Sequence, residues 1–527
     1  MKLRNLALVL CASSALFAAC SDDDSGTASV GDAGAAGTGT AGTSGTAGTA
    51  GKAGDAGAAG MTDMAGAAGM ADTAGAGGMA GAAGLAGSGG EAGASTVRSF
   101  TVTLENIAPA KAFTSSGVFN TPVGDLLPGP ATAGKKYTFT VDAGRKQKLS
   151  FATMLAATND LFFAPTGEGI ALYHADDGTP IGSAALPVDV TDQVFLWDAG
   201  TEANEEPFLG ANTVTNQLPA GNIGPVDPNN KVRQLVGNSD GVHTYPAVST
   251  MIQVTVAHTT GTMFAITITD LAGAMLGVTT DTLDHPAPLS PGVWVLSSAA
   301  NPLFTDQMPA PAHGLEALAE DGNPTALGVY AHNTSGITYP ASPGAFVIHS
   351  TGTKPLFTSG LADYGKGLEA IAEDGNAAPL GVSLPSLNGY ITGAVFNTPV
   401  GAGAPGPIFP GSKYQFTFDA KPGDSLSFAT MLAATNDVFL SPGAAGIPLF
   451  AVDGTAVTGD LSSLVSLWDA GTEGNEEPGI GPNTVTNQLL PNTGTPGEGK
   501  VQLLSAITTD YSYPSAQSVL KVTLATN

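Results

Sequence analysis

Acidic residues recur at matching places in two distant segments of the chain and could bind a divalent cation. Asp160 and Asp198 each adjoin an apolar strand-like run and turn-forming residues, and Asp437 and Asp469 repeat this pattern. Calcium takes about six to eight oxygen ligands, usually gathered from loops at one end of a scaffold. We therefore expect a calcium site at these residues. The alternative is that Asp198 and Asp469 only accept hydrogen bonds from the backbone of the turn that follows.

The chain shows no set of residues typical of an enzyme. Residues 237–241 (GNSDG) match the G-x-S-x-G pattern, but they precede His243 in a loop and not in the strand–turn–helix that a nucleophile elbow needs. There is no H-E-x-x-H and no P-loop, and none of the seven histidines has a counterpart in the repeated segments. We expect no catalysis. The alternative is a secreted hydrolase with its site in the segment 259–385.

The elements that must hold these residues are strands. Runs such as 99–104 (SFTVTL), 137–141 (YTFTV) and 414–418 (YQFTF) alternate apolar and polar residues, and Gly, Pro, Asn and Asp separate the runs at short intervals. Helical periodicity is scarce. The pattern predicts an all-β chain of antiparallel sandwiches.

Internal repeats divide the folded part of the chain. Residues 119–124 (FNTPVG) and 150–160 (SFATMLAATND) recur 277 positions later, and 197–202 (WDAGTE) recurs 271 positions later. The order of the motifs is kept, which indicates two tandem copies of one domain. We place these copies at 97–258 and 259–527.

A smaller repeat lies between the larger ones, at about 286–385. Residues 314–323 (GLEALAEDGN) return at 367–376 (GLEAIAEDGN), and each copy predicts a short amphipathic helix that ends at Gly322 or Gly375. A Glu-Asp pair precedes each of these glycines. We interpret the pairs as solvated acids that end a packed helix, with a metal site as the alternative.

The N-terminal part is typical of an exported lipoprotein. Lys2 and Arg4 precede a short apolar run that ends in small residues followed by Cys20, which resembles the bacterial lipobox. We expect a signal peptide at 1–19, lipidation of Cys20, and a flexible Gly/Ala-rich tether at 20–96. An ordinary cleavage site is the alternative. The expected location is the bacterial outer membrane or cell surface, with membrane contact only through the lipid.

The charge balance excludes some partners. The chain has 18 Lys and Arg against 45 Asp and Glu, a formal net charge of −27. Binding to nucleic acid requires clustered basic residues, and so does attraction to anionic lipid headgroups. We expect neither.

Two of the repeated motifs together resemble the spondin N-terminal domain family. Animal members carry Pro-Asp-Trp-Phe and Asp-Ala-Gly-Thr-Asp segments in this order, and here they appear as 159–162 (NDLF) with 198–202 (DAGTE), and as 436–439 (NDVF) with 469–473 (DAGTE). The resemblance covers residues 97–527. It implies a sandwich of eight antiparallel strands similar to a C2 domain, an extracellular location, adhesion, and bound calcium in some members. The Trp, the last Asp and the cysteines of the animal domains are not kept.

The resemblance also extends the expected calcium site. In the animal domains an acid at about the place of Asp142 and Asp419 helps to hold the ion, and so does another that would correspond to Glu168. The second copy has Ala445 near that place. The expected metal ligands are Asp142, Asp160, Glu168 and Asp198, with Asp419, Asp437 and Asp469 in the second copy.

These observations lead to one functional expectation. We expect a surface-anchored adhesion or binding module, which calcium would stabilise and which engages an extracellular protein or glycan. Two copies would raise avidity without new contacts.

Overall fold

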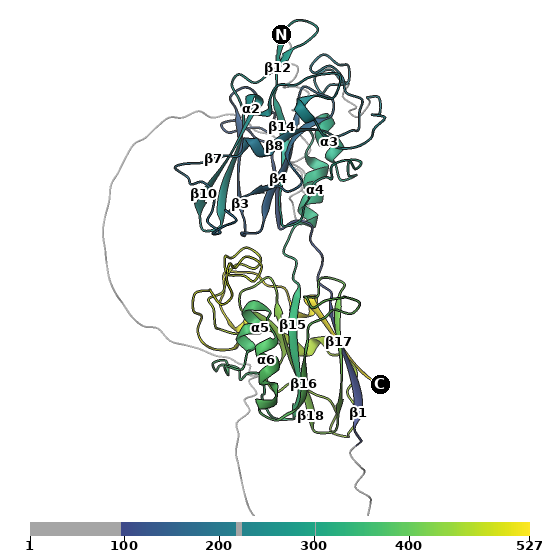
Figure 1. Ribbon diagram of the computed structural model, residues 1–527, viewed down its shortest axis with the longest axis vertical. Coiled ribbons are helices and arrows are strands. Elements are labelled where there is room, and N and C mark those ends of the chain that lie inside the picture. The colour runs from purple at the N-terminus through teal and green to yellow at the C-terminus, as the bar shows by residue number, and fades with distance from the viewer. Residues whose placement is uncertain (1–95, 218–223, 301) are drawn as a thin grey trace, which may run out of the picture. The chain divides into compact units, whose positions relative to one another are not determined.

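The computed structural model describes residues 96–217, 224–300 and 302–527. The expected signal peptide, Cys20 and nearly all of the tether lie outside these residues. The described chain is mostly antiparallel sheet, which confirms the predicted fold class (Figure 1). Among the described residues, no helix is long and apolar enough to cross a membrane.

The strands form two β-sandwiches. We call the elements from β2 to α4 sandwich A, and β1 together with the elements from β15 to β24 sandwich B. In each sandwich a four-stranded sheet faces a seven-stranded sheet. Two short helices that follow one another in the chain pack on the seven-stranded sheet.

In sandwich A the four-stranded sheet has the order β3-β11-β10-β7, with bounds Lys136–Asp142, Met263–Asp270, Ile252–Thr260 and Val188–Asp189. The larger sheet has the order β2-β14-β4-β5-β8-β9, with bounds Ser115–Phe119, Leu289–Ser297, Lys148–Leu155, Leu161–Pro165, Val194–Asp198 and Arg233–Gln234. Strand β6 (Ile170–Ala171) adds to β4, and β12 (Met275–Val278) pairs with β13 (Asp284–Pro286). The helices are α2 (Val248–Met251), α3 (Leu315–Asp321) and α4 (Thr325–Thr334), with short 3-10 turns at Thr191–Gln193 and Val236–Asn238.

In sandwich B the four-stranded sheet has the order β17-β1-β24-β21, with bounds Lys413–Ala420, Arg98–Asn106, Leu520–Thr526 and Gly459–Asp460. The larger sheet has the order β16-β15-β18-β19-β22-β23, with bounds Tyr390–Phe396, Ala341–Ser350, Asp424–Leu432, Val438–Pro442, Val465–Asp469 and Gln502–Leu503. Strand β20 (Ile447–Pro448) adds to β18. The helices are α5 (Leu368–Asp374), α6 (Ala378–Ser383) and α7 (Ala516–Val519), with 3-10 turns at Leu384–Ser386, Ser462–Leu464 and Leu504–Ala506.

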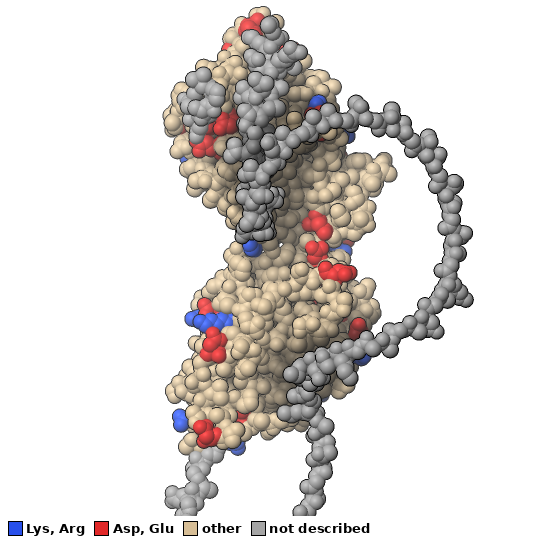
Figure 2. Space-filling model, turned by 180° about the vertical axis from the view of Figure 1, so that it is seen from behind, with Lys and Arg blue, Asp and Glu red and all other residues tan. Residues whose placement is uncertain are grey.

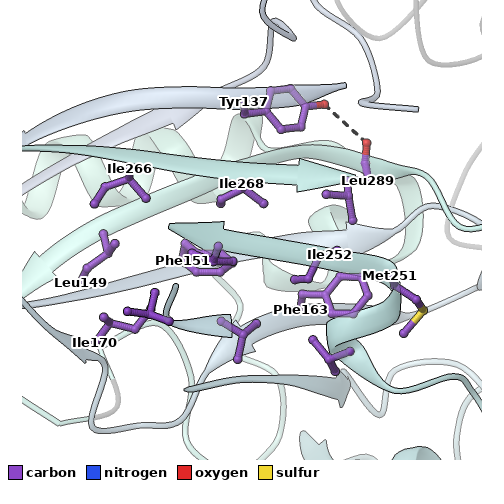
Figure 3. Close-up of a cluster of buried hydrophobic side chains, with 14 of the residues drawn as sticks. Tyr137, Leu149, Phe151, Phe163, Ile170, Met251, Ile252, Ile266, Ile268 and Leu289 are labelled. Atoms are coloured by element: carbon purple, nitrogen blue, oxygen red, sulfur yellow. Dashed lines mark hydrogen bonds between the residues drawn. The ribbon is translucent and has the colours of Figure 1, made fainter. Parts of the chain in front are cut away.

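Each seven-stranded sheet is buried on both faces at its central strands. Its inner face joins the core between the sheets, where Phe151, Phe163 and Ile268 of sandwich A lie together (Figure 3). Its outer face is covered by the helices, so every residue of β5 is buried. Trp197 lies in that second cluster against Phe304 and donates its indole N–H to the carbonyl oxygen of Ala164 at 3.1 Å. Trp197 and its counterpart Trp468 are both core residues, at 3% and 7% exposed.

The two sandwiches do not follow one another along the chain. Strand β1 lies between β17 and β24, with Val102 opposite Phe416 on one side and Leu524 on the other. Sandwich A is therefore inserted between the first and second strands of sandwich B. The expected boundary between 258 and 259 is not where the sandwiches divide, because it falls inside the antiparallel β10–β11 pair.

Sandwich A is a circular permutation of sandwich B. Strand β11 takes the place in sandwich A that β1 takes in sandwich B, and β14 corresponds to β15. The smaller repeat at 286–385 is thus part of the same duplication, and segment 259–385 supplies strands and helices to both sandwiches. The helices predicted at its two copies are confirmed as α3 and α5, and each ends at a left-handed glycine, Gly322 or Gly375.

Matched substitutions test this division of the chain. Leu104→Ala in β1 should destabilise sandwich B, and Ile268→Ala in β11 should destabilise sandwich A, because each side chain is fully buried in its own core. Removing either should cost about 2 to 5 kcal/mol of unfolding free energy. Hydrogen exchange read peptide by peptide is the measurement. Loss of protection in β10 and β11 upon Leu104→Ala would contradict the assignment of β1 to sandwich B.

Candidate functional site

Strand register brings the predicted acid pairs together. In sandwich A, Leu161 lies opposite Asp198, so Asp160 at the start of β5 adjoins Asp198 at the end of β8. In sandwich B, Val438 lies opposite Asp469 in the same way, which places Asp437 beside it. All four carboxyl groups are buried, with side chains at most 3% exposed.

A tight turn follows each pair and depends on glycine. Gly200 has a φ of 67°, and a Cβ there would lie 2.2 Å from the carbonyl oxygen of Lys231. The turn lets Asp198 Oδ1 accept the N–H of Gly200 at 2.6 Å, and Asp469 Oδ1 accepts that of Gly471 at 2.5 Å. The expected capping of this turn by Asp198 and Asp469 is therefore present.

The other acid of each pair is less well satisfied. Asp160 Oδ2 accepts the backbone N–H groups of Thr201 and Glu202, both at 3.2 Å, whereas Oδ1 is buried without a hydrogen-bond partner. Oδ1 of Asp437 is buried without a partner as well. Burial raises the pKa of both carboxyls, and the neighbouring Asp198 or Asp469 raises it further.

A helix adds a further acid to each pair, the Glu of the Glu-Asp pair that precedes Gly322 or Gly375. Glu320 in α3 and Glu373 in α5 are 1% and 2% exposed, and neither has a hydrogen-bond partner for its carboxyl oxygens. Burial raises the pKa of Glu320 to about 8 and that of Glu373 to about 7. The interpretation of these residues as solvated acids was wrong, because the helices pack their last turns against the seven-stranded sheets.

The two sandwiches differ in how the pair is neutralised. In sandwich A, Nη2 of Arg233 lies 2.5 Å from Oδ2 of Asp198 and 2.8 Å from the carboxyl of Asp227. In sandwich B the residue opposite Asp469 is Gln502, whose amide donates to Glu498 at 3.0 Å. Within the described residues of sandwich B, no Lys or Arg forms an ion pair with Asp437 or Asp469.

An acidic cavity of about 580 Å³ lies beside the pair of sandwich B. Its lining includes the acids Asp469, Glu473, Glu498 and Asp510, and it contains no Lys, Arg or His. Asp469 and Glu473 are buried, whereas Glu498 and Asp510 are exposed. The site thus carries acidic groups from the interior to the surface, and burial raises the pKa of the two inner ones, Asp469 and Glu473. On the face shown in Figure 2, acidic side chains form a few small groups, with larger uncharged areas between them.

The remaining predicted ligands lie at the other end of the strands. Asp142 ends β3 before the hairpin to β4, and Asp160 follows the far end of β4, whose eight residues span roughly 26 Å. Glu168 is 75% exposed and pairs with Lys148 at the start of β4. Asp419 is exposed near the end of β17, opposite Ser99. The structure therefore does not bring these three residues to the acid pairs.

A calcium ion would fit sandwich B better than sandwich A. The described residues contain no group of three or more His, Cys, Asp or Glu side chains arranged to hold a metal. Arg233 already neutralises Asp198, which leaves little reason for a cation there. In sandwich B, Asp437 and Asp469 would hold the ion and Glu473 could join them by releasing the N–H of Gly494. The sequence predicted the more complete site in the first copy, and the charge balance favours the second.

Two hydroxyl groups lie near histidines without forming a catalytic site. Ser239, in the G-x-S-x-G match, donates to the carbonyl oxygen of His243 and not to its ring. Ser427 lies 3.0 Å from Nε2 of His349, a pair that sequence reasoning missed. His349 and Ser427 are both buried, at 0% and 2% exposed. We interpret this pair as a buried hydrogen bond.

Compared with models of known protein families and with curated protein sequences, the chain has no match. The structure contains two similar buried carboxyl pairs. The pair of sandwich A binds the guanidinium of Arg233, and Asp469 of the pair in sandwich B lines an acidic cavity.

The buried helix acids predict a pH dependence. A carboxyl whose pKa is raised on folding holds its proton in the folded state after the unfolded chain has lost it, so stability falls as pH rises from about 4.5 to about 8. Glu320→Gln should remove up to roughly 5 kcal/mol of this loss, at about 1.4 kcal/mol per pH unit over this window. Urea unfolding at pH 5 and pH 8.5 is the measurement. If the unfolding free energy changed by the same amount between pH 5 and pH 8.5 in the variant and in the parent chain, Glu320 would ionise normally in the folded state.

Exchanging the residues opposite the acid pairs tests the charge balance. Arg233→Gln should lower the unfolding free energy of sandwich A by about 3 kcal/mol, because it leaves Asp198 buried without its positive partner. Gln502→Arg should instead stabilise sandwich B. Calorimetry combined with hydrogen exchange assigns each change to its sandwich. A destabilised sandwich B in Gln502→Arg would show that Asp469 does not need a counter-charge.

Proposed function

We propose that this chain is an extracellular binding protein without catalytic activity, and that sandwich B recognises a positively charged group of its ligand. One observation carries the proposal. Asp469 belongs to a buried carboxyl pair for which the described residues supply no counter-ion, and it lines a cavity together with three further acids and no base. A cation bound here would neutralise Asp469, as Arg233 neutralises Asp198 in sandwich A.

Three further points support binding over catalysis. Both sandwiches provide rigid strands that end at the acid pairs, with loops between them, which is a common arrangement for recognition sites. The resemblance of the repeated motifs to spondin N-terminal domains favours adhesion to an extracellular protein or glycan. The lipid anchor at Cys20 and the tether enter the proposal from the sequence alone, and they would display the sandwiches at the bacterial surface.

Calcium is the cation that the resemblance favours. It would bind the folded chain and not the unfolded one, so it would raise stability by mass action, by roughly 2.7 kcal/mol at one hundred times its dissociation constant. Asp437 and Asp469 are the residues that would hold it. An organic cation of the ligand is the other form of positive charge that the cavity can take.

Binding assays with cationic probes test the proposed function. The full chain should bind calcium, basic peptides or an amino-sugar polymer such as chitosan, and a Glu498→Gln/Asp510→Asn variant should bind at least threefold more weakly. Glycan and peptide arrays, calcium titration and a panel of hydrolase substrates are the measurements. The matched control is Glu105→Gln/Asp419→Asn, which removes the same charge from β1 and β17. Turnover of a substrate, or the absence of binding to every cationic probe, would contradict the proposal.

A further inference from the structure

Sandwich A shows how this acid pair accommodates a guanidinium. Oδ2 of Asp198 accepts the amide of Asn204 at 2.6 Å and also the guanidinium of Arg233 at 2.5 Å. In sandwich B, Oδ2 of Asp469 accepts the amide of Asn475 at 2.5 Å, and Gln502 stands at the strand position of Arg233. The carboxylate that binds a guanidinium in one sandwich is thus held in the same way in the other.

The cavity beside Asp469 suits a guanidinium better than a metal ion. Oδ1 and Oδ2 of Asp469 each accept a protein hydrogen bond, and so do both oxygens of Glu473. Calcium would require several of these oxygens to be released. A guanidinium offers five N–H donors in a fixed fork, and a carboxylate oxygen can accept more than one of them. Tyr511 also lines the cavity, and an aromatic residue is a favourable neighbour for a cation.

A second hollow adjoins the acidic cavity and is mainly apolar. It has a volume of about 400 Å³, and its lining includes Val465, Leu467, Leu503 and Pro514. Ile507 and Thr509 line both hollows, so the two lie next to each other in sandwich B. A ligand that extends from the acidic cavity along β22 therefore meets apolar side chains next.

We propose that sandwich B binds an extended peptide segment that carries an arginine next to an apolar residue. The guanidinium enters the acidic cavity and pairs with Asp469 and Glu498, and the apolar side chain occupies the adjoining hollow. This inference rests on the proposed function, since it names the cationic group for the same site. It makes the ligand a partner protein with an exposed arginine.

Titration of the full chain with short peptides tests the inference. N-acetyl-arginine amide should bind saturably, the lysine analogue at least threefold more weakly, and the citrulline analogue, which has the same shape without charge, at least tenfold more weakly. Gln502→Arg should reduce the affinity for the arginine probe at least tenfold, because its own guanidinium then occupies Asp469. Gln415→Arg is the matched control. It adds the same charge to the exposed face of β17 in the same sandwich and should leave the affinity unchanged.

The apolar hollow has its own test. Acetylated Arg-Leu or Leu-Arg amide should bind about fivefold more tightly than the corresponding peptide with glycine, and Ile507→Ser should remove this preference while the arginine probe alone still binds.

Glu498→Gln serves as a second variant for the acidic cavity, and it should weaken the binding of the arginine probe at least threefold. Thermal unfolding checks that each variant is folded.

The outcomes separate this inference from the proposed function. Suppose that calcium or chitosan binds, that Gln502→Arg weakens this binding, and that the arginine probe does not bind. This result would overturn the inference and leave the proposed function in place. Equal affinity for arginine and citrulline would overturn the inference as well. Suppose instead that the arginine probe binds with the same affinity to the parent chain and to the Gln502→Arg and Glu498→Gln variants. The guanidinium would then lie outside the acidic cavity, and the inference would be overturned.

Discussion

The backbone pairing of β1 with β17 and β24 is the constraint on which the rest of the structure depends. Both neighbours meet β1 along nearly its whole length, from Arg98 to Asn106, and Phe100, Val102 and Leu104 fill the core beneath. Without β1 the four-stranded sheet of sandwich B would be divided, and β17 and β24 would each have an unpaired edge. Sandwich A can be inserted after β1 because β1 still pairs with β17 and β24, which completes the four-stranded sheet of sandwich B.

The sequence predicted the elements and the repeated motifs better than the connections between them. The alternating runs identified the strands, and the motifs 277 positions apart identified equivalent residues. The permutation was missed because its signals lie at other spacings: Phe100 matches Phe264 at 164 positions, and Ser290 matches Ser342 at 52. Motif order alone cannot reveal a permutation, since β1 is separated from its sandwich by the complete inserted one.

The candidate site was predictable only where it depends on local motifs. Asp160 and Asp198 were found because each lies at a strand end with a turn beside it, and the register of β5 with β8 joins them. Asp142 and Glu168 were expected at the site but lie one strand length away. The burial of Glu320 could not be seen, because helical periodicity does not show that the last turn packs against a sheet. The sequence shows Arg233 in one copy and Gln502 in the other. Their role as partners of the acids could be inferred only from the strand pairing, which places them opposite Asp198 and Asp469.

The position of β1 has a mechanical consequence. The strand enters its sheet at Arg98, beside Ala420, at the end where the hairpin between β17 and β18 lies. The acid pair of sandwich B lies at the opposite end, because β18 runs nine residues away from that hairpin before Asp437 follows. A pull between the chain before Arg98 and a ligand held at Asp469 would therefore act along the strands. The hydrogen bonds on both sides of β1 would bear this force together in shear, which is the direction in which a β-sheet resists extension most strongly.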